Sequence, residues 1–282
     1  MRWDFGAIYK KIRKSKGLSQ KEVCGNQLSR TSLSKIEACE RVPNIENMIF
    51  LLNQIDMSLE EFRYICNYYQ PSKKQLIFNK IYNHTSSTDT TELEGIQKDC
   101  LTYLKTHHDV PIQHINDTLT IVIHLRKHGL SKSSEEFLEA TRRIWNYIEK
   151  QDEWYENDIK LLGTILYSYP IDYLPLVTDK LLRSLKKYQY YRNIKPLEVN
   201  LLANIAKLYL HHDRKDNCED ISSRLLLVAK DIKQYDVMAI AYIYLGICRG
   251  DDVLIDRGRA LLRLTEETQL LEVLEKEIKN YR

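Results

Sequence analysis

The fold of this protein is decided by residues 17–43, which read GLSQKEVCGNQLSRTSLSKIEACERVP. Ser19 and Glu22 have the spacing of a capping box, in which the serine and glutamate side chains satisfy free amides at the start of a helix. Ser29 is a good N-cap for a further helix that runs through Glu37. The stretch therefore predicts two short helices that are joined by a tight turn.

Further helices are predicted on both sides of this pair. Before Gly17, apolar side chains recur with helical period at Phe5, Ile8, Tyr9 and Ile12. Downstream, Asn44 opens a fourth helix, and a second capping box at Ser58 and Glu61 opens a fifth. We therefore expect a domain of five helices over residues 1–67, followed by a linker at 68–73.

Positive charge is concentrated in this N-terminal part. Residues 1–73 hold 12 Lys and Arg against 8 Asp and Glu, whereas the rest of the chain holds 30 against 31. A basic helical domain suits a polyanion as partner. Two short helices, the second beginning with small polar and basic residues, are typical of a helix-turn-helix that places one helix in the major groove of DNA. The alternative is that these charges form only the solvated face of a helical bundle.

Residues 17–43 resemble the repressor-type helix-turn-helix of the Rgg family, which are bacterial peptide-pheromone-responsive regulators of the RRNPP type. The resemblance extends more loosely over the whole chain. It implies that the helix opening at Ser29 is the recognition helix, with Ser32 as a lesser candidate for contact with bases. The implied DNA-binding residues are Gln20, Ser29, Arg30, Thr31, Ser32, Lys35 and Arg41.

The resemblance also implies a role for each of the main residues. By motif position, Arg30, Thr31 and Lys35 are the readers of base edges. Gln20 lies where the family's glutamine contacts a phosphate and braces the recognition helix, and Arg41 lies where a basic residue reaches the DNA backbone. Base contacts of this kind give sequence discrimination, whereas phosphate contacts give affinity alone.

The chain departs from the family pattern after the recognition helix. The usual Arg-Gly pair is replaced by Ala38-Cys39, which puts a cysteine where a left-handed backbone is expected. The cysteine that links some family dimers corresponds to Ile45, so that disulfide is not expected here. We expect Cys39 to be an unreacted thiol, with redox coupling as the alternative.

Residues 74–282 are predicted to form an array of helix hairpins. Helix-period segments are broken at regular spacing, on the scale of about 35–45 residues for a hairpin, which is typical of tetratricopeptide-like repeats. Residues 237–248, VMAIAYIYLGIC, are apolar on every side and predict a central helix, with Asp236 as its cap. The expected fold is all-α, with the array serving peptide binding and dimerisation.

A peptide site is predicted on this array. Asn200 and Asn204 are four residues apart on one face of the helix at 199–211, where amides can bond the main chain of an extended peptide. The resemblance implies that a peptide lies on the concave surface. By position, the implied peptide-binding residues are Arg142, Arg143, Trp154, Tyr167, Asn200, Asn204 and Tyr242. Arg142 and Arg143 are alternatives, since neighbours on a helix diverge by about 100°. An exposed helix face for the amides, and a core position for the aromatic residues, are the other interpretations.

No catalytic signature accompanies these features. The sequence contains no GxGxxG, P-loop, GxSxG or HExxH motif, and His124 and His128 have no third metal ligand. Its six cysteines include no CxxC pair. We therefore expect no enzyme activity, cofactor or metal. The absence of a long apolar run or leader predicts a cytoplasmic protein without membrane contact.

The sequence as a whole predicts a transcriptional regulator of the quorum-sensing type. The expected partners are double-stranded promoter DNA, a short signalling peptide and a second copy of the chain, with RNA polymerase as a further candidate. One alternative is a protein-interaction scaffold whose N-terminal bundle serves dimerisation alone. A second is a phosphatase-like helical array, which is disfavoured because such relatives do not carry a repressor-type helix-turn-helix.

Overall fold

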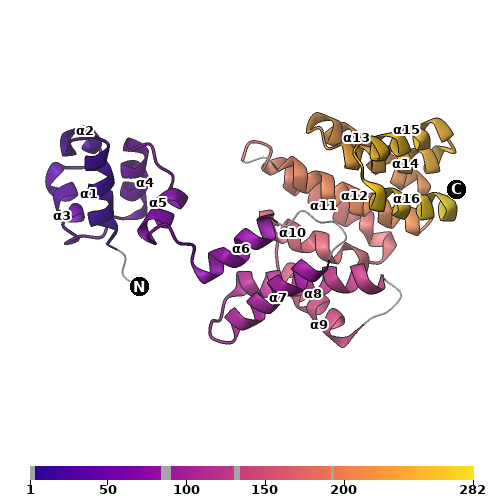
Figure 1. The fold of residues 1–282 in the computed structure, drawn as a ribbon, viewed down its shortest axis with the longest axis horizontal. Helices are drawn as coiled ribbons and strands as arrows, with labels where there is room; N and C mark the ends of the chain where they lie inside the picture. The colour runs from indigo at the N-terminus through magenta and orange to yellow at the C-terminus, as the bar shows by residue number, and fades with distance from the viewer. Residues whose placement is uncertain (1–3, 84–89, 130–133, 192–193) are drawn as a thin grey trace. The chain divides into compact units, whose positions relative to one another are not determined.

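The computed structural model describes residues 4–83, 90–129, 134–191 and 194–282. Every regular element in these residues is a helix (Figure 1), so the all-α prediction is confirmed. None of the described helices combines the length and the apolar content that crossing a membrane requires. The chain divides into two compact units, Met1–Asn83 and His84–Arg282.

The described part of the first unit contains six helices, four of which begin at the predicted caps. They are α1 (Phe5–Ser15), α2 (Gln20–Cys24), α3 (Arg30–Glu37), α4 (Ile45–Gln54), α5 (Leu59–Cys66) and α6 (Lys73–Asn83). Ser19 and Glu22 form a complete capping box, and the side chains of Ser29, Asn44 and Ser58 each accept a backbone amide hydrogen bond. These bonds satisfy amides that have no partner within the helix, which explains where each helix starts.

One apolar core joins α1 to α5. Tyr9 and Phe62 are buried, and the Tyr9 hydroxyl donates to the Leu51 carbonyl at 3.1 Å. At Gly6, α1 crosses α3 so closely that a Cβ atom would lie 1.7 Å from the carbonyl oxygen of Ile36. Glycine at this position therefore allows α1 to lie directly against α3.

A hydrogen-bonded turn connects α5 to α6. Tyr68 and Tyr69 have φ angles of 56° and 58°, and the Tyr69 amide donates to the Tyr64 carbonyl at 3.1 Å. The sequence predicted a linker at 68–73, whereas the compact units divide after Asn83. The first residues of the predicted linker therefore form a hydrogen-bonded turn and not an extended segment.

The second unit is a series of helix hairpins. It contains α7 (Thr91–Leu104), α8 (Val110–His128), α9 (Glu135–Ile148), α10 (Glu156–Ile165), the 3₁₀ turns η1 (Leu166–Ser168) and η2 (Ile171–Tyr173), α11 (Leu174–Lys187), α12 (Lys195–His211), α13 (Lys215–Asp231), α14 (Tyr235–Arg249), α15 (Asp252–Leu264) and α16 (Thr268–Tyr281). Consecutive helices pack on each other, and one core extends from α8 to α16. The predicted helical array is thus confirmed.

The central helix of this unit is α14. Side chains from Val237 to Ile247 are buried around its circumference, as the apolar run predicted. The predicted cap, Asp236, was wrong. The helix begins at Tyr235, its N-cap residue is Gln234, and no side chain caps it. Asp236 therefore lies inside the first turn, where a negative charge favours the helix dipole without being a cap.

Candidate nucleic-acid interface and helical-repeat pocket

Helix α3 presents a polar outer face. Arg30, Thr31 and Lys35 are exposed. Ser29 accepts the Ser32 amide at 3.1 Å and donates its hydroxyl to the Ser32 hydroxyl at 2.9 Å. The two serine hydroxyls are therefore engaged at the helix start, and the three exposed side chains form the outer surface.

The cations on and beside α3 are open to a partner. Arg30, Lys35 and Arg41 are exposed, and none of them makes an ion pair with another described residue. A surface cation without an internal counter-charge can neutralise a phosphate without first breaking a salt bridge. This group of side chains is thus suited to contact with a polyanion.

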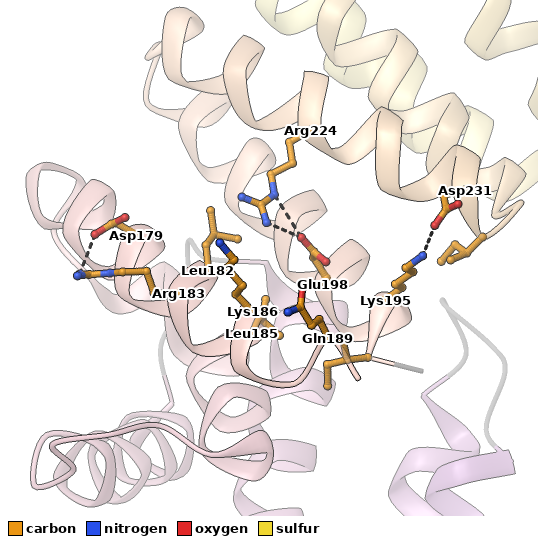
Figure 2. Close-up of a pocket in the computed structure, with 12 residues that line it drawn as sticks. Asp179, Leu182, Arg183, Leu185, Lys186, Gln189, Lys195, Glu198, Arg224 and Asp231 are labelled. Carbon is orange, nitrogen blue, oxygen red and sulfur yellow. Dashed lines mark hydrogen bonds and ion pairs between the residues drawn. The ribbon is translucent and has the colours of Figure 1, made fainter. Parts of the chain in front are cut away.

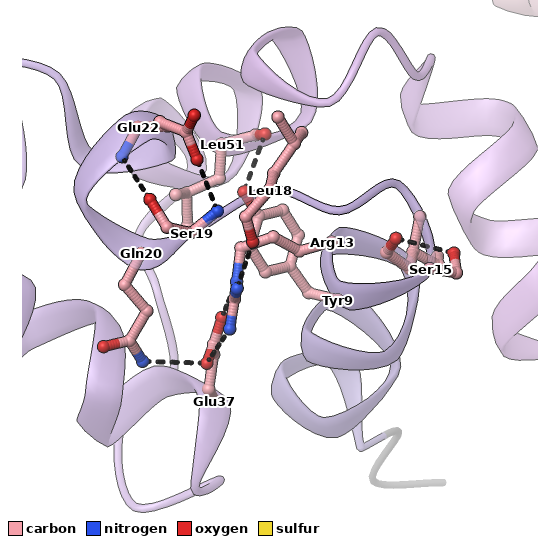
Figure 3. Close-up of polar contacts among 10 residues, drawn as sticks. Tyr9, Arg13, Ser15, Leu18, Ser19, Gln20, Glu22, Glu37 and Leu51 are labelled. Carbon is pink, nitrogen blue, oxygen red and sulfur yellow. Dashed lines mark hydrogen bonds and ion pairs between the residues drawn. The ribbon is translucent and has the colours of Figure 1, made fainter.

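A buried ion pair holds the end of α3 against α1 (Figure 3). Arg13 Nε and Nη2 donate to the two carboxylate oxygens of Glu37 at 2.6 and 2.9 Å. Gln20 Nε2 donates to Glu37 Oε2 at 2.9 Å, and Arg13 also donates to the Leu18 carbonyl. One carboxylate on α3 therefore connects α1, α2 and α3.

The electrostatics of this pair show that both groups are ionised. Burial on its own would raise the pKa of Glu37, but the hydrogen bonds from Arg13 and Gln20 outweigh it and hold the pKa below its usual value. The hydrogen bond to Glu37 raises the pKa of Arg13 in turn. If either Arg13 or Glu37 were removed, the charge of the other would be buried without a counter-charge. The orientation of α3 therefore depends on both residues.

The turn after α3 has the left-handed residue that the sequence suggested. Cys39 has a φ of 60°, and its amide donates to the Ile36 carbonyl at 2.9 Å. The amides of Glu40 and Arg41 both donate to the Lys35 carbonyl. The turn therefore forms without glycine, although a left-handed non-glycine residue costs about 1–2 kcal/mol.

A cavity of about 600 Å³ lies in the second unit and is mostly apolar. Its wall is formed by Val122, Leu125 and Gly129 from α8 and its end, Gly163, Thr164, Leu166 and Tyr167 from α10 and η1, and Asn204, Lys207, Leu208 and His211 from α12. We call it the α8–α10–α12 pocket. Asn204, Lys207 and His211 follow one another on one face of α12, so the pocket has one polar edge.

The polar edge is tied to the last helix through a buried carboxylate. Glu277 on α16 accepts from Lys207 Nζ at 2.9 Å and from the Tyr244 hydroxyl at 2.8 Å, and His211 Nε2 lies 3.8 Å away. Burial would raise the pKa of Glu277, but His211, Lys207 and Tyr244 outweigh it and lower the pKa. Lys207 is thus positioned by α16 at the pocket edge.

The structure brings together only two of the residues that the sequence proposed for a peptide. Tyr167 and Asn204 both line the α8–α10–α12 pocket, and the Tyr167 hydroxyl contacts the Thr141 hydroxyl at 2.8 Å. Asn200 is exposed one turn before Asn204 and does not line it. Its amide therefore has no part in this cavity.

The other proposed residues lie elsewhere in the array. Arg142 and Arg143 are both exposed, and Arg143 is paired with the buried Asp117 at 2.6 Å. Trp154 is buried, and Lys180 Nζ lies 4.1 Å from the centre of its ring. Tyr242 is half-buried and packs against the core that α12, α13 and α14 form together. None of these side chains lines the α8–α10–α12 pocket.

A second cavity, of about 770 Å³, lies between α11, α12 and α13 (Figure 2). Three ion pairs line it, Asp179 with Arg183, Glu198 with Arg224, and Lys195 with Asp231. A ligand would compete with these pairs for their charges. The smaller, apolar cavity is therefore better suited to a peptide with apolar side chains.

Comparison with known families decides the identity. Residues 97–246 match the C-terminal domain of the HTH-type transcriptional regulator Rgg, and residues 10–62 match a helix-turn-helix domain. The first match alone covers more than half of the chain. The chain belongs to the Rgg family. Because this is a family of transcriptional regulators, the prediction of a regulator and not an enzyme is confirmed. No curated protein sequence matches this Rgg chain.

Solved structures share the fold of this Rgg chain. Rgg2, the SHP pheromone receptor of Streptococcus dysgalactiae, is 15% identical, with a TM-score of 0.66 and 98% of each chain covered. A putative transcriptional regulator from Listeria monocytogenes EGD-e is 16% identical, with a TM-score of 0.69, covering 100% of this chain and 98% of the other. Bacillus thuringiensis PlcR, solved with the peptide PapR7 and DNA, is 15% identical, with a TM-score of 0.65, covering 99% and 100%. At these identities, the likeness concerns the fold.

Sequence reasoning missed several residues that shape the two sites of this Rgg chain. Arg13 and Glu37 were not singled out, because they are 24 residues apart and nothing local pairs them. Lys207 was not proposed as a site residue, and Glu277 is 70 residues beyond it. A signal did exist for Lys207 and His211, since both share the α12 face of Asn204.

Proposed function

We propose that this Rgg chain is a homodimeric regulator that reads a promoter site with the outer face of α3 and is controlled by a short signalling peptide bound in the α8–α10–α12 pocket. The observation that carries the proposal is the presence in one chain of a braced helix with open cations and an apolar pocket with an amide edge. PlcR, which shares the fold, was solved with both a peptide and DNA. A promoter target also places the protein in the bacterial cytoplasm, with RNA polymerase as a further partner.

For DNA binding, we propose that the residues on and beside α3 have two different roles, contact with bases and contact with phosphates. Arg30, at the exposed N-terminal turn of α3, can donate two hydrogen bonds to a guanine in the major groove. Thr31 and Lys35 complete the reading surface. Arg41, in the turn after α3, and Gln20 contact phosphates, which fix the position of the helix and carry no sequence information.

Two variants separate these roles. We expect Arg30→Ala to lose about 1–3 kcal/mol of discrimination at one base position, whereas Arg41→Ala weakens binding to all sequences and reduces the salt slope by about 1. Arg263→Ala, which removes an exposed cation from the second unit, is the matched control. Binding of the three variants is measured by fluorescence anisotropy against the promoter site and a shuffled site, from about 0.05 to 0.2 M salt. Unchanged site preference in Arg30→Ala would remove it from the reading surface, and no DNA binding by the full chain would favour the scaffold alternative.

Dimerisation is expected because one short recognition helix buries too little surface for site selection. Besides the array, to which the sequence assigns dimerisation, the first unit exposes apolar side chains around a cavity of about 530 Å³, namely Val42, Ile45 and Leu59. A second copy on this face would cover them. Ile45→Asp is therefore expected to weaken the dimer of the full chain in light scattering over a dilution series, and an unchanged dissociation constant would exclude this face.

Peptide binding, as we propose it, depends on the polar edge of the α8–α10–α12 pocket. Asn204 can donate to and accept from the main chain of a peptide, while Val122, Leu125 and Leu208 cover apolar side chains. Peptide binding would control DNA binding only if the peptide favours one arrangement of the dimer over another. The proposal therefore requires different affinities for the peptide in the two arrangements.

Asn204 has a matched control in Asn200, which is the same residue type one turn away and outside the pocket. Synthetic peptides encoded by short open reading frames beside the gene are titrated by calorimetry into wild type and both variants. We expect Asn204→Ala to lose about 1–3 kcal/mol of binding free energy and Asn200→Ala to match wild type. Equal losses of binding free energy in the two variants, or a loss in Asn200→Ala alone, would show that the peptide does not bind in this pocket.

A further inference from the structure

Two cysteines on neighbouring helices of the second unit lie at the same level. The hairpin of α13 and α14 is joined by three residues, so its helices are antiparallel. Cys218 lies 13 residues before Asp231, the last residue of α13, and Cys248 lies 13 residues after Tyr235, the first residue of α14. At 1.5 Å per residue, both are therefore about 20 Å from the turn.

Adjacent side chains confirm that these levels meet across the hairpin. Glu219 and Arg249, the next residues along the two helices, form an ion pair with Nε and Oε1 2.8 Å apart. Cys248 packs against the apolar core that contains Cys218. Cys218 has no exposed surface and lies 3.8 Å from the Ser222 hydroxyl, whereas Cys248 is only half-buried.

The two thiols also differ in their readiness to ionise. The interaction of the two thiols raises the pKa of Cys218 and lowers that of Cys248. Burial and Glu219 oppose the lowering at Cys248, and Lys215 and Arg249 add to it, so that the pKa of Cys248 remains lowered. Burial raises the pKa of Cys66 to about 11 and that of Cys100 to about 11. Cys248 thus combines partial exposure, a depressed pKa and a buried thiol beside it, which is the combination found in oxidation-sensitive cysteines.

We propose that Cys218 and Cys248 are an oxidisable thiol pair, which hydrogen peroxide converts into a disulfide across the α13–α14 hairpin. The Cys248 thiolate attacks one peroxide oxygen, the O–O bond breaks, and the other oxygen leaves and becomes water on protonation. The sulfenic acid formed on Cys248 is then attacked by the sulfur of Cys218, with release of a second water. Two thiols and one peroxide give one disulfide and two waters, and two electrons pass from sulfur to oxygen.

The test uses the full chain with Cys39→Ser, which removes the exposed thiol that lies outside the pair. The protein is treated with hydrogen peroxide, remaining thiols are alkylated, and peptides are mapped by mass spectrometry. We expect an intact mass lower by about 2 Da before alkylation and, after digestion, a fragment that joins Cys218 to Cys248, both reversed by dithiothreitol. Recovery of both cysteines reduced, or a disulfide between other cysteines, would overturn the proposal.

Two further variants test the assigned order of attack. In Cys218→Ser, Cys248 has no partner, so a sulfenic acid that dimedone traps is expected in its place. In Cys248→Ser, the fully buried Cys218 is expected to stay reduced. Oxidation of Cys218 at the wild-type rate in that variant would refute the role given to Cys248. Because the readout needs neither DNA nor peptide, failure here leaves the proposed function untouched.

Discussion

Replacing Arg13 with methionine tests whether the buried pair holds α3 in place. Methionine retains the apolar part of the side chain but cannot donate a hydrogen bond. Glu37, which is 3% exposed, then loses both hydrogen bonds that Arg13 donates to its carboxylate. Gln20 is then the one side-chain donor that remains of this group. Removal of one member of a buried ion pair costs about 3–5 kcal/mol, which is a large part of the stability of an ordinary domain.

Hydrogen exchange along a urea series measures the free energy of unfolding of each unit separately. Amides of α1 and α3 report on the first unit. In a Trp3→Phe background, the remaining tryptophans, Trp145 and Trp154, both lie in the second unit and report on it by fluorescence. We expect Arg13→Met to lower the protection of the first unit by about 3–5 kcal/mol and to leave the midpoint of the second unit unchanged.

The double variant Arg13→Met with Glu37→Leu leaves no charge of this pair buried alone. It is therefore expected to recover most of the stability that either single variant loses. A loss below about 1 kcal/mol in Arg13→Met, or a double variant as unstable as the sum of the singles, would refute the reasoning.

The same pair gives a pH dependence with a defined sign. The pKa of Glu37 is lower in the folded protein than in the unfolded chain. Its contribution to stability is therefore present above the unfolded pKa of about 4.3 and is lost as the pH falls through the folded pKa. Arg13→Met is expected to lose this dependence in acid unfolding measurements.

Three smaller changes test other contacts. Cys39→Gly is expected to stabilise the first unit by about 1 kcal/mol in urea unfolding, because glycine tolerates a φ of 60°; Cys39→Ala, which keeps the strain, is the control and should show no gain. Gly6→Ala is expected to destabilise that unit by at least about 1–3 kcal/mol, since its Cβ would overlap a carbonyl of α3, while Gly95→Ala, with open space around it, should be neutral or stabilising in the same assay. The pKa of Glu277 is lowered in the folded protein, so its contribution to the docking of α16 should be lost as the pH falls through that pKa. Glu277→Gln should remove this acid dependence from the hydrogen exchange of α16, and an unchanged pH profile would contradict the prediction.

Elements that depend on neighbours in the sequence were predictable. The starts of α2, α3 and α5 follow from serines whose side chains bond amides three residues on, and α14 was visible as a run that is apolar on every side. Asp236 shows the limit of this reasoning. Its residue type suits a cap, but the helix begins one residue before it, and position alone decides whether a carboxylate caps.

The sequence alone determined that the chain is helical, that its N-terminal part is basic and that a helix begins after Ser29, because caps, periodicity and charge are local properties. Only the tertiary structure decided that Glu37 joins Arg13, that Asn204 lines a pocket while Asn200 does not, and that Cys218 and Cys248 lie at one level of the α13–α14 hairpin. Each of these depends on which faces of distant helices pack together. The hydrophobic effect that drives such packing is non-directional, so the pairing of side chains is set by the shape of the whole core.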